Sequence, residues 1–153
     1  MADTFKLGPF SVATQQASYR VQAPNSSPRE LLIVPLGEAS GKLLELVAQP
    51  PYRNAKFVPY TPSGEPWRKT IDERNLDLVV MVGFVGENLA QVIAIGETCI
   101  ARKVKISSIL IHKDASEIVA LSSALRSMRP WSQTLAVVSD ADYVPGLLHA
   151  LGA

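Results

Sequence analysis

The sequence predicts one α/β domain of three layers: a doubly wound, mostly parallel sheet of about five strands between two layers of helices. From Arg29 onward, short continuous apolar runs alternate with segments whose apolar residues recur every three or four positions. Continuous apolar runs are typical of strands covered on both faces, and parallel strands need helical crossovers between them. A chain of 153 residues is long enough to bury one core without disulfides or metals. These features are typical of Rossmann-like and flavodoxin-like domains.

Five segments have the length and the apolar content expected of strands. They are residues 31–34, 55–60, 78–82, 104–111 and 135–138. The run at 78–82 is the strongest strand of the five. Between the second and third runs, residues 60–67 contain two prolines and a glycine and directly follow Pro59, which predicts a loop that continues through a polar segment to Asn75.

Four segments carry helical spacing. They are residues 40–48, 89–101, 114 to about 129, and a closing helix at 143–151. The pair Asp114 and Glu117 has the spacing of a capping box at the start of the third helix. We expect the inner faces of the four helices to be formed by Leu43, Leu44 and Val47; by Leu89, Val92, Ile93, Gly96, Cys99 and Ile100; by Ile118, Leu121, Ser122 and Leu125; and by Tyr143, Leu147, Leu148 and Leu151.

Residues 1–28 differ from the rest and are expected to form an extended arm and a linker, with the single domain at 29–153. Phe10 and Val12, and then Tyr19 and Val21, suggest two short strands. Residues 23–28 contain two prolines among small polar residues, which opposes both helix and sheet. Such an arm docks on another subunit, lies on its own domain or is partly disordered.

The composition excludes several classes of partner. The net charge is +1, from 15 basic and 14 acidic residues, so nothing global attracts nucleic acid or an acidic membrane. The most apolar stretch is far shorter than the roughly 20 residues of a membrane-spanning helix. The polar N-terminus does not have the pattern of a signal peptide, and Cys99 is the one cysteine, so we expect a cytoplasmic protein with a buried, unreactive thiol.

The candidate site is the edge where the strands end. Ligands of such sheets bind beyond the carboxyl ends of the strands, where helix N-termini present free N–H groups. In this sequence each of four predicted strands is followed there by polar or glycine residues. The candidate ligand-binding residues are Gly37, Glu38, Ser40, Lys42, Gly83, Gly86, Glu87, Asn88, His112, Ser139, Asp140 and Asp142.

Two glycine-containing turns in this set partly match phosphate-binding motifs. Residues 37–42 contain one residue too few between the glycines, and Leu43 stands where a phosphate loop has Ser or Thr. A turn before a helix and an anion site without hydrolysis both remain open. Residues 83–86 have two glycines, but Leu89 stands where the third glycine of a dinucleotide signature would be.

Two segments resemble known families. Residues 77–95 resemble the strand, glycine loop and helix of tubulin-like GTP-binding proteins, without that family's dense glycine run. The segment from Ser139 to Gly152, with Asp140 and Asp142 before a helix, resembles the last acidic motif of NYN/PIN-like nucleases. That resemblance implies carboxylates that hold a divalent metal, which activates water. The same aspartates are also typical caps of a helix N-terminus.

Three functional hypotheses follow. The first is a binding module for a small anionic or nucleotide-like ligand or a partner protein, working as a non-catalytic accessory or oligomeric subunit. The second is a metal-dependent phosphoesterase or nuclease that uses Asp140, Asp142 and Asp114, and the third is a structural assembly protein. The sequence specifies no cofactor, and we expect a homo-oligomer or a partner protein.

Overall fold

Five apolar segments form the central sheet. The computed structural model describes residues 29–49, 52–114 and 117–153. Its strands are β2 (Leu31–Pro35), β3 (Ala55–Phe57), β4 (Leu78–Phe84), β5 (Lys105–Ile111) and β6 (Thr134–Val138). All neighbouring strands are parallel, in the order β3-β2-β4-β5-β6. This is the strand order of flavodoxin-like doubly wound domains, which confirms the predicted fold class.

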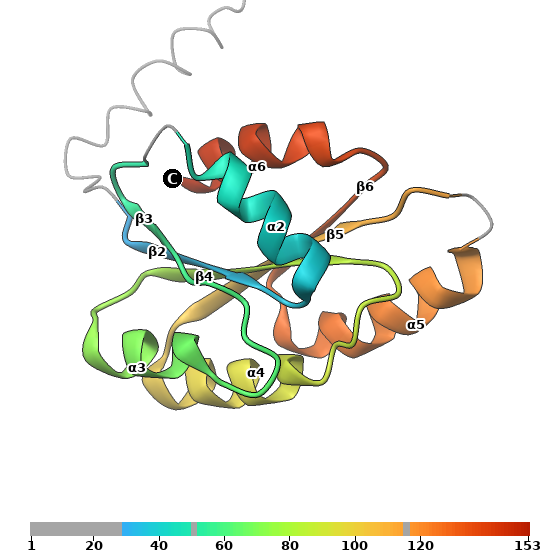
Figure 1. The fold of residues 1–153 in the computed structure, drawn as a ribbon. Helices are drawn as coiled ribbons and strands as arrows, with labels where there is room; N and C mark the ends of the chain where they lie inside the picture. Colours follow the sequence, from blue (N-terminus) through green and yellow to red (C-terminus); the bar gives the residue numbers. More distant parts are fainter. Residues whose placement is uncertain (1–28, 50–51, 115–116) are drawn as a thin grey trace, which may run out of the picture.

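Helices cover both faces of this sheet (Figure 1). On one face lie α2 (Glu38–Val47) and α6 (Val144–Leu151). On the other face lie α3 (Pro66–Glu73), α4 (Gln91–Arg102) and α5 (Ile118–Met128). Two short 3-10 helices, η2 (Arg129–Trp131) and η3 (Ala141–Tyr143), flank β6. None of the helices in the described part of the chain has the length and apolar character needed to cross a membrane.

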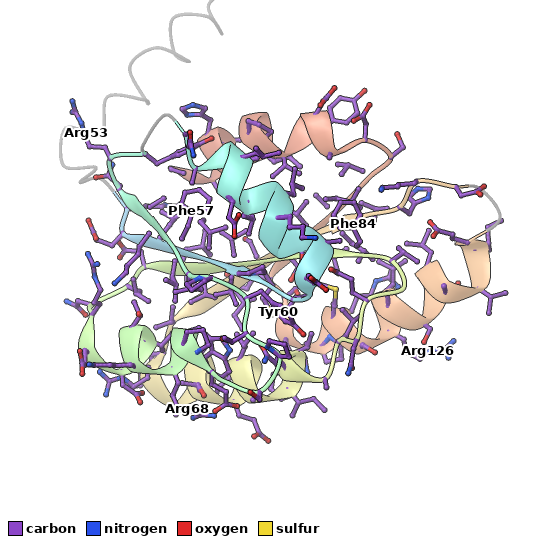
Figure 2. All side chains as sticks on the ribbon, viewed as in Figure 1. Arg53, Phe57, Tyr60, Arg68, Phe84 and Arg126 are labelled. Atoms are coloured by element: carbon purple, nitrogen blue, oxygen red, sulfur yellow. The ribbon has the colours of Figure 1, made fainter. Side chains whose placement is uncertain are left out.

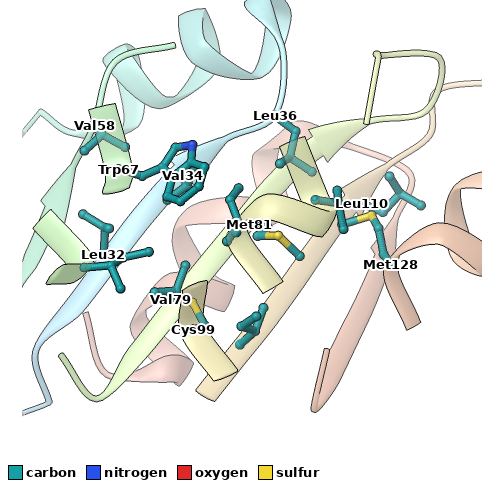
Figure 3. Packing of buried hydrophobic residues seen from close by; sticks show 14 of the residues in the cluster. Leu32, Val34, Leu36, Val58, Trp67, Val79, Met81, Cys99, Leu110 and Met128 are labelled. Atoms are coloured by element: carbon teal, nitrogen blue, oxygen red, sulfur yellow. The ribbon is translucent and has the colours of Figure 1, made fainter. Parts of the chain in front are cut away.

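The side chains of each strand alternate between two cores because successive residues point to opposite faces of the sheet. In β2, Leu32 and Val34 enter the core beneath α3, α4 and α5, whereas Leu31 and Ile33 enter the core beneath α2 and α6. Figure 3 shows the first of these cores, in which Trp67 of α3 packs among strand residues. The indole is almost fully buried and therefore belongs to the core.

One helix was not predicted. Residues 66–73 were expected to be a loop and a polar connection, but they form α3. Pro66 occupies the first helical turn, where its missing N–H costs nothing. The buried residues of α3 are Trp67, Thr70 and Ile71, a stripe too short to be recognised as periodic among charged neighbours.

The predicted inner faces were partly wrong. In α4, Ile93 and Ile100 are exposed, and Ile95 takes their place in the core. In α5, Ala124 and Met128 are buried, and Ile118 and Ser122 face solvent. Tyr143, expected to face inward, is 60% exposed. In each case the helix is rotated relative to the predicted face, so that residues one or two positions away from the predicted ones are buried.

Several predicted element bounds also differ from the structure. The strand expected at 55–60 ends at residue 57, and β4 continues two residues beyond the predicted 78–82, to Phe84. Helix α2 begins at Glu38, before the predicted 40–48, and α4 begins two residues after Leu89. The predicted arm and linker at 1–28 lie outside the described residues.

Candidate functional site

The site lies where the helices that follow β2 and β4 turn to opposite faces of the sheet. These neighbouring strands are parallel, with Pro35 opposite Val82, but α2 leaves β2 on one face of the sheet and α4 follows β4 on the other. This switch of faces opens a crevice at the carboxyl edge, which is the usual ligand position in open α/β sheets. The backbone N–H of Leu36 donates to the carbonyl of Val82 (2.9 Å), so the two strand ends remain paired up to the turn.

The Glu87 carboxylate lies in this crevice and binds the N-terminus of α2. Its Oε2 accepts a hydrogen bond from the backbone N–H of Ser40 (3.1 Å), a donor in the first turn that has no partner within the helix. Its Oε1 lies 2.9 Å from the Ser40 hydroxyl, which can donate to it, and accepts from the backbone N–H of Phe84 (2.8 Å). One carboxylate therefore joins the beginning of α2 to the end of β4.

Gly37 allows this contact. Its backbone is extended (φ −156°), so the position needs glycine for space and not for conformation. A Cβ at residue 37 would overlap with the Glu87 carboxylate, and one at Gly83 would press on Leu36. Gly86, by contrast, has φ +99° and open space around it, so there glycine serves the backbone of the turn.

The contact between Glu87 and Ser40 occupies the position where the sequence predicted an anion site. A helix N-terminus attracts anions through its free N–H groups and its positive dipole end. Here the protein's own carboxylate takes the position beside Ser40. Glu38 and Lys42, which were also candidates, lie on the exposed side of α2 with their charged groups 3.8 Å apart.

Beside Glu87 there is an open cavity of about 310 Å³ at the ends of β4 and β5. Phe84, which Figure 2 labels, forms part of its wall, and the Lys113 ammonium lies 5.0 Å from the centre of the Phe84 ring. The other lining residues come from α2, the loop after β4, the end of β5 and the start of α5: Ala39, Val85, Gly86, Glu87, Ile111 and Glu117.

Glu117 is fixed at the far wall of this cavity. Its Oε1 accepts hydrogen bonds from the backbone N–H groups of Lys113 (3.1 Å) and Asp114 (3.3 Å). The bond to Asp114 is the Glu117 half of the predicted capping box. The cavity thus combines one ammonium, two carboxylates and one aromatic ring on backbone that is held by hydrogen bonds.

Other predicted site residues lie apart from this cavity. Asn88 Oδ1 accepts from the backbone N–H of Ala90 (3.0 Å), as in a turn before a helix. The backbone of His112 pairs with Val138, and its side chain is half-buried. Asp140 Oδ1 accepts from the backbone N–H of Asp142 (2.9 Å), so Asp140 acts as the cap of η3.

Within the described ranges, no group of three or more His, Cys, Asp or Glu side chains is placed to hold a metal ion. Of the predicted set, the structure gathers the two glycine turns at the crevice: Gly37, Ser40, Gly83, Gly86 and Glu87. It leaves Ser139, Asp140 and Asp142 beyond the end of β6.

No protein-family model matches this chain, and no curated protein or solved structure matches it significantly. The crevice and the cavity are therefore the features of the molecule that bear on its function.

Sequence reasoning did not identify three residues of the cavity as site residues. Phe84 lies two residues after the predicted strand at 78–82 and was placed in the loop that follows it, and Lys113 follows His112 directly in the sequence. Glu117 was recognised only as a cap. The available signal was position: all three follow strands whose ends meet at the carboxyl edge.

Proposed function

We propose that this protein is a non-catalytic binding module that takes a small nucleotide-like ligand in the cavity beside Glu87. The observation that supports this best is the set of opposite charges around Phe84, beside the switch between β2 and β4. Parallel α/β domains bind small ligands at this edge, because successive strands deliver their following loops there. The single buried thiol of Cys99 suits a reducing cytoplasm, which is the location we propose.

The lining chemistry defines the class of ligand. The Lys113 ammonium is exposed and suits an anionic group such as a phosphate. Glu87 Oε2 accepts one hydrogen bond and has capacity for a second, which suits an N–H donor on the ligand. The Phe84 ring adds an apolar surface to the same cavity. A flat, N–H-bearing ring joined to an anionic group matches this pattern, and 310 Å³ lies at the lower end of the range for ligand pockets.

Glu87 directs the anionic group away from α2. Because its carboxylate already lies against the Ser40 N–H, a phosphate placed there would meet a like charge. The anionic part of the ligand therefore belongs at Lys113. Asp140 serves as a cap, so no observation favours the metal-dependent phosphoesterase as a second candidate.

A thermal-shift panel of nucleosides, mononucleotides, dinucleotides and magnesium tests this proposal. A ligand at about 100 times its Kd adds roughly 2.7 kcal/mol to the free energy of unfolding, so the melting temperature should rise with a mononucleotide. Lys113→Ala should weaken this shift. Lys42→Ala is the matched control, because Lys42 is exposed and does not line the cavity.

Two results would contradict the proposal. One is a panel in which no nucleoside or nucleotide changes the melting temperature at millimolar concentration. The other is a shift that Lys113→Ala and Lys42→Ala leave equally intact. A shift with magnesium alone, lost in Asp140→Asn, would support the phosphoesterase instead.

A further inference from the structure

Among the strands that the structure describes, β6 forms a free edge of the sheet. It pairs with β5 on one side, and it is the last strand in the order of the sheet. Its sequence, Thr134 to Val138, contains no charged residue and no proline. Free edges in soluble proteins are usually protected by charges, prolines or bulges, because an unprotected edge can pair with another strand. Strand β6 itself, as the structure describes it, carries none of these protections.

The ladder with β5 determines which backbone groups of β6 are free. The His112 N–H donates to the carbonyl of Val138 (2.9 Å), and Ile111 lies opposite Val138 in the register. Alternate residues of a parallel strand point to the same neighbour. The peptide groups of Ala136 and Val138 therefore point to β5, whereas those of Leu135 and Val137 point away from the sheet.

On one side of the β6 edge lies an apolar flank of α5. The helix side bearing Ser123 and Ser127 faces the loop before α4, where these residues line one cavity. The opposite side of α5, with Leu125 beside Ser122, Arg126 and Arg129, lines an open hollow of about 510 Å³. By helical spacing Ile118, which is 66% exposed, lies on this second side, and Val137 of β6 is 40% exposed on the same face of the sheet.

The other face of the edge has a similar flank. His149 of α6 contacts the Tyr52 ring, with ring centres 5.5 Å apart, so this side of α6 faces β3. By helical spacing, Tyr143 and Leu147 lie on the opposite side, toward the β6 edge. Tyr143 is mostly exposed and Leu147 is half-buried. The free strand thus lies between two flanks that each carry an exposed apolar or aromatic side chain, Ile118 on one and Tyr143 on the other.

We propose that the β6 edge pairs with the β6 edge of a second copy of this chain, antiparallel and about a two-fold axis at Ala136. In this register, Leu135 lies opposite Val137 of the partner subunit, so the outward peptide groups of both strands form hydrogen bonds. All five residues of each β6 are then paired. The two sheets join into one of ten strands, twice the five of a single chain.

Charge complementarity supports a second copy as the occupant. Arg126 and Arg129 precede β6 at its amino end, and Asp142 follows it at its carboxyl end; all three are exposed. Antiparallel pairing brings the acidic end of one strand to the basic end of the other. Among the residues that the structure describes, none of these three side chains forms an ion pair within its own protomer.

The flanks of α5 and α6 would add buried interface area to the small area that the paired β6 strands bury alone. Stable interfaces bury about 1,200–2,000 Å² in total, more than two short strands provide. Ile118 and Tyr143 border the edge on opposite faces of the sheet, so each would be covered by the partner subunit. This proposal does not depend on the proposed ligand, whose cavity is lined by other residues.

The mass of the full chain in solution, measured by sedimentation across a concentration series, tests the interface. The wild-type chain is expected to be a dimer. Val137→Pro removes an N–H that points outward, so it leaves the ladder with β5 intact and should give a monomer. Val137→Lys should also give a monomer, and it covers the case in which the proline variant fails to fold. Val119→Lys is the control, because Val119 is exposed outside the edge and should leave the dimer unchanged.

Disulfide trapping tests the register. In the proposed pairing, Ala136 lies opposite itself at a position without hydrogen bonds, where Cβ atoms are about 4.5–5.5 Å apart. Ala136→Cys should therefore form a covalent dimer on oxidation. Ser139→Cys should not, because the two copies of residue 139 lie about six residues apart along the strands, roughly 20 Å.

A monomeric wild-type chain at about 100 µM would overturn the proposal. So would a dimer that both Val137 variants leave intact, or Ser139→Cys cross-linking faster than Ala136→Cys. A charge-reversal pair gives a final check: Arg129→Asp and Asp142→Arg should each weaken the dimer at low salt, and the double variant should restore it.

Discussion

The Glu87 carboxylate does for α2 what a bound anion does for the helix N-termini of many α/β proteins. It satisfies a backbone donor of the first turn and lies near the positive end of the helix. It also accepts from the Phe84 N–H, so it links two elements that the chain separates by a long crossover. This one residue therefore contributes both to stability and to the shape of the candidate site.

Glu87→Gln should lower the free energy of unfolding by about 1–3 kcal/mol, since the neutral amide replaces a charged acceptor of backbone N–H groups. Chemical denaturation of both proteins measures the difference. Glu38→Gln is the matched control, because Glu38 is exposed in the first turn of α2, the turn that Glu87 contacts, and should change stability by less than about 0.5 kcal/mol. Equal effects of the two substitutions would show that the buried hydrogen bonds of Glu87 contribute little.

Cys99 gives a pH-dependent prediction. Burial of the thiol raises its pKa from 9.0 to about 12. Above pH 9 the unfolded chain loses this proton while the native protein keeps it, so the stability from Cys99 declines as the pH rises from about 9 to 12. The slope from this one group is at most about 1.4 kcal/mol per pH unit.

Urea denaturation of the wild type and of Cys99→Ala between pH 8 and 10.5 measures this effect. Other groups titrate in both proteins, so the informative quantity is the difference between them. That difference should narrow as the pH rises. A constant difference would mean that the native thiol ionises as readily as the unfolded one.

At the scale of elements, α4 and η2 meet through a glycine and an indole. A Cβ at Gly96 would overlap with the Trp131 ring, so the close approach of the helix depends on glycine. Gly96→Ala should lower the free energy of unfolding by about 1–3 kcal/mol through overpacking.

Gly146→Ala is the matched comparison, and we expect it to raise the free energy of unfolding where Gly96→Ala lowers it. Gly146 lies inside α6 with open space where its Cβ would be. Alanine there should stabilise the protein by about 0.5–1 kcal/mol, because glycine is a poor helix former. Thermal denaturation of both variants measures the contrast. Two changes of the same sign would contradict the packing of Trp131 on α4.

The sequence predicted a strand or helix best where many consecutive residues follow the same apolar pattern. The apolar runs of β2 and β4 and the spacing of α4 are long enough to identify each element. Helix α3 was missed because its buried stripe is three residues long. The rotation of α5 was misjudged because Ala124 faces the sheet, and alanine carries little hydropathic signal.

At the scale of the whole molecule, the alternation of strands and helices predicted the class of fold. It did not predict the order of the strands, which depends on the face of the sheet that each crossover takes. The switch between β2 and β4 follows from that order. The sequence therefore predicted a polar carboxyl edge, including the two glycine turns. It could not predict that Glu87 lies against Ser40, a contact across 47 positions of the chain.

Both ends of the domain described from Arg29 to Ala153 lie at one corner, at the amino edge of the sheet. Arg29 begins the approach to β2, and its guanidinium lies 3.5 Å from the Leu151 carbonyl. Helix α6 returns the chain to this corner, next to β3 (Figure 1). A tag, a tether or a fused protein attached at Ala153 therefore starts on the side opposite the cavity. Surface immobilisation through that end would leave the carboxyl edge facing the solution.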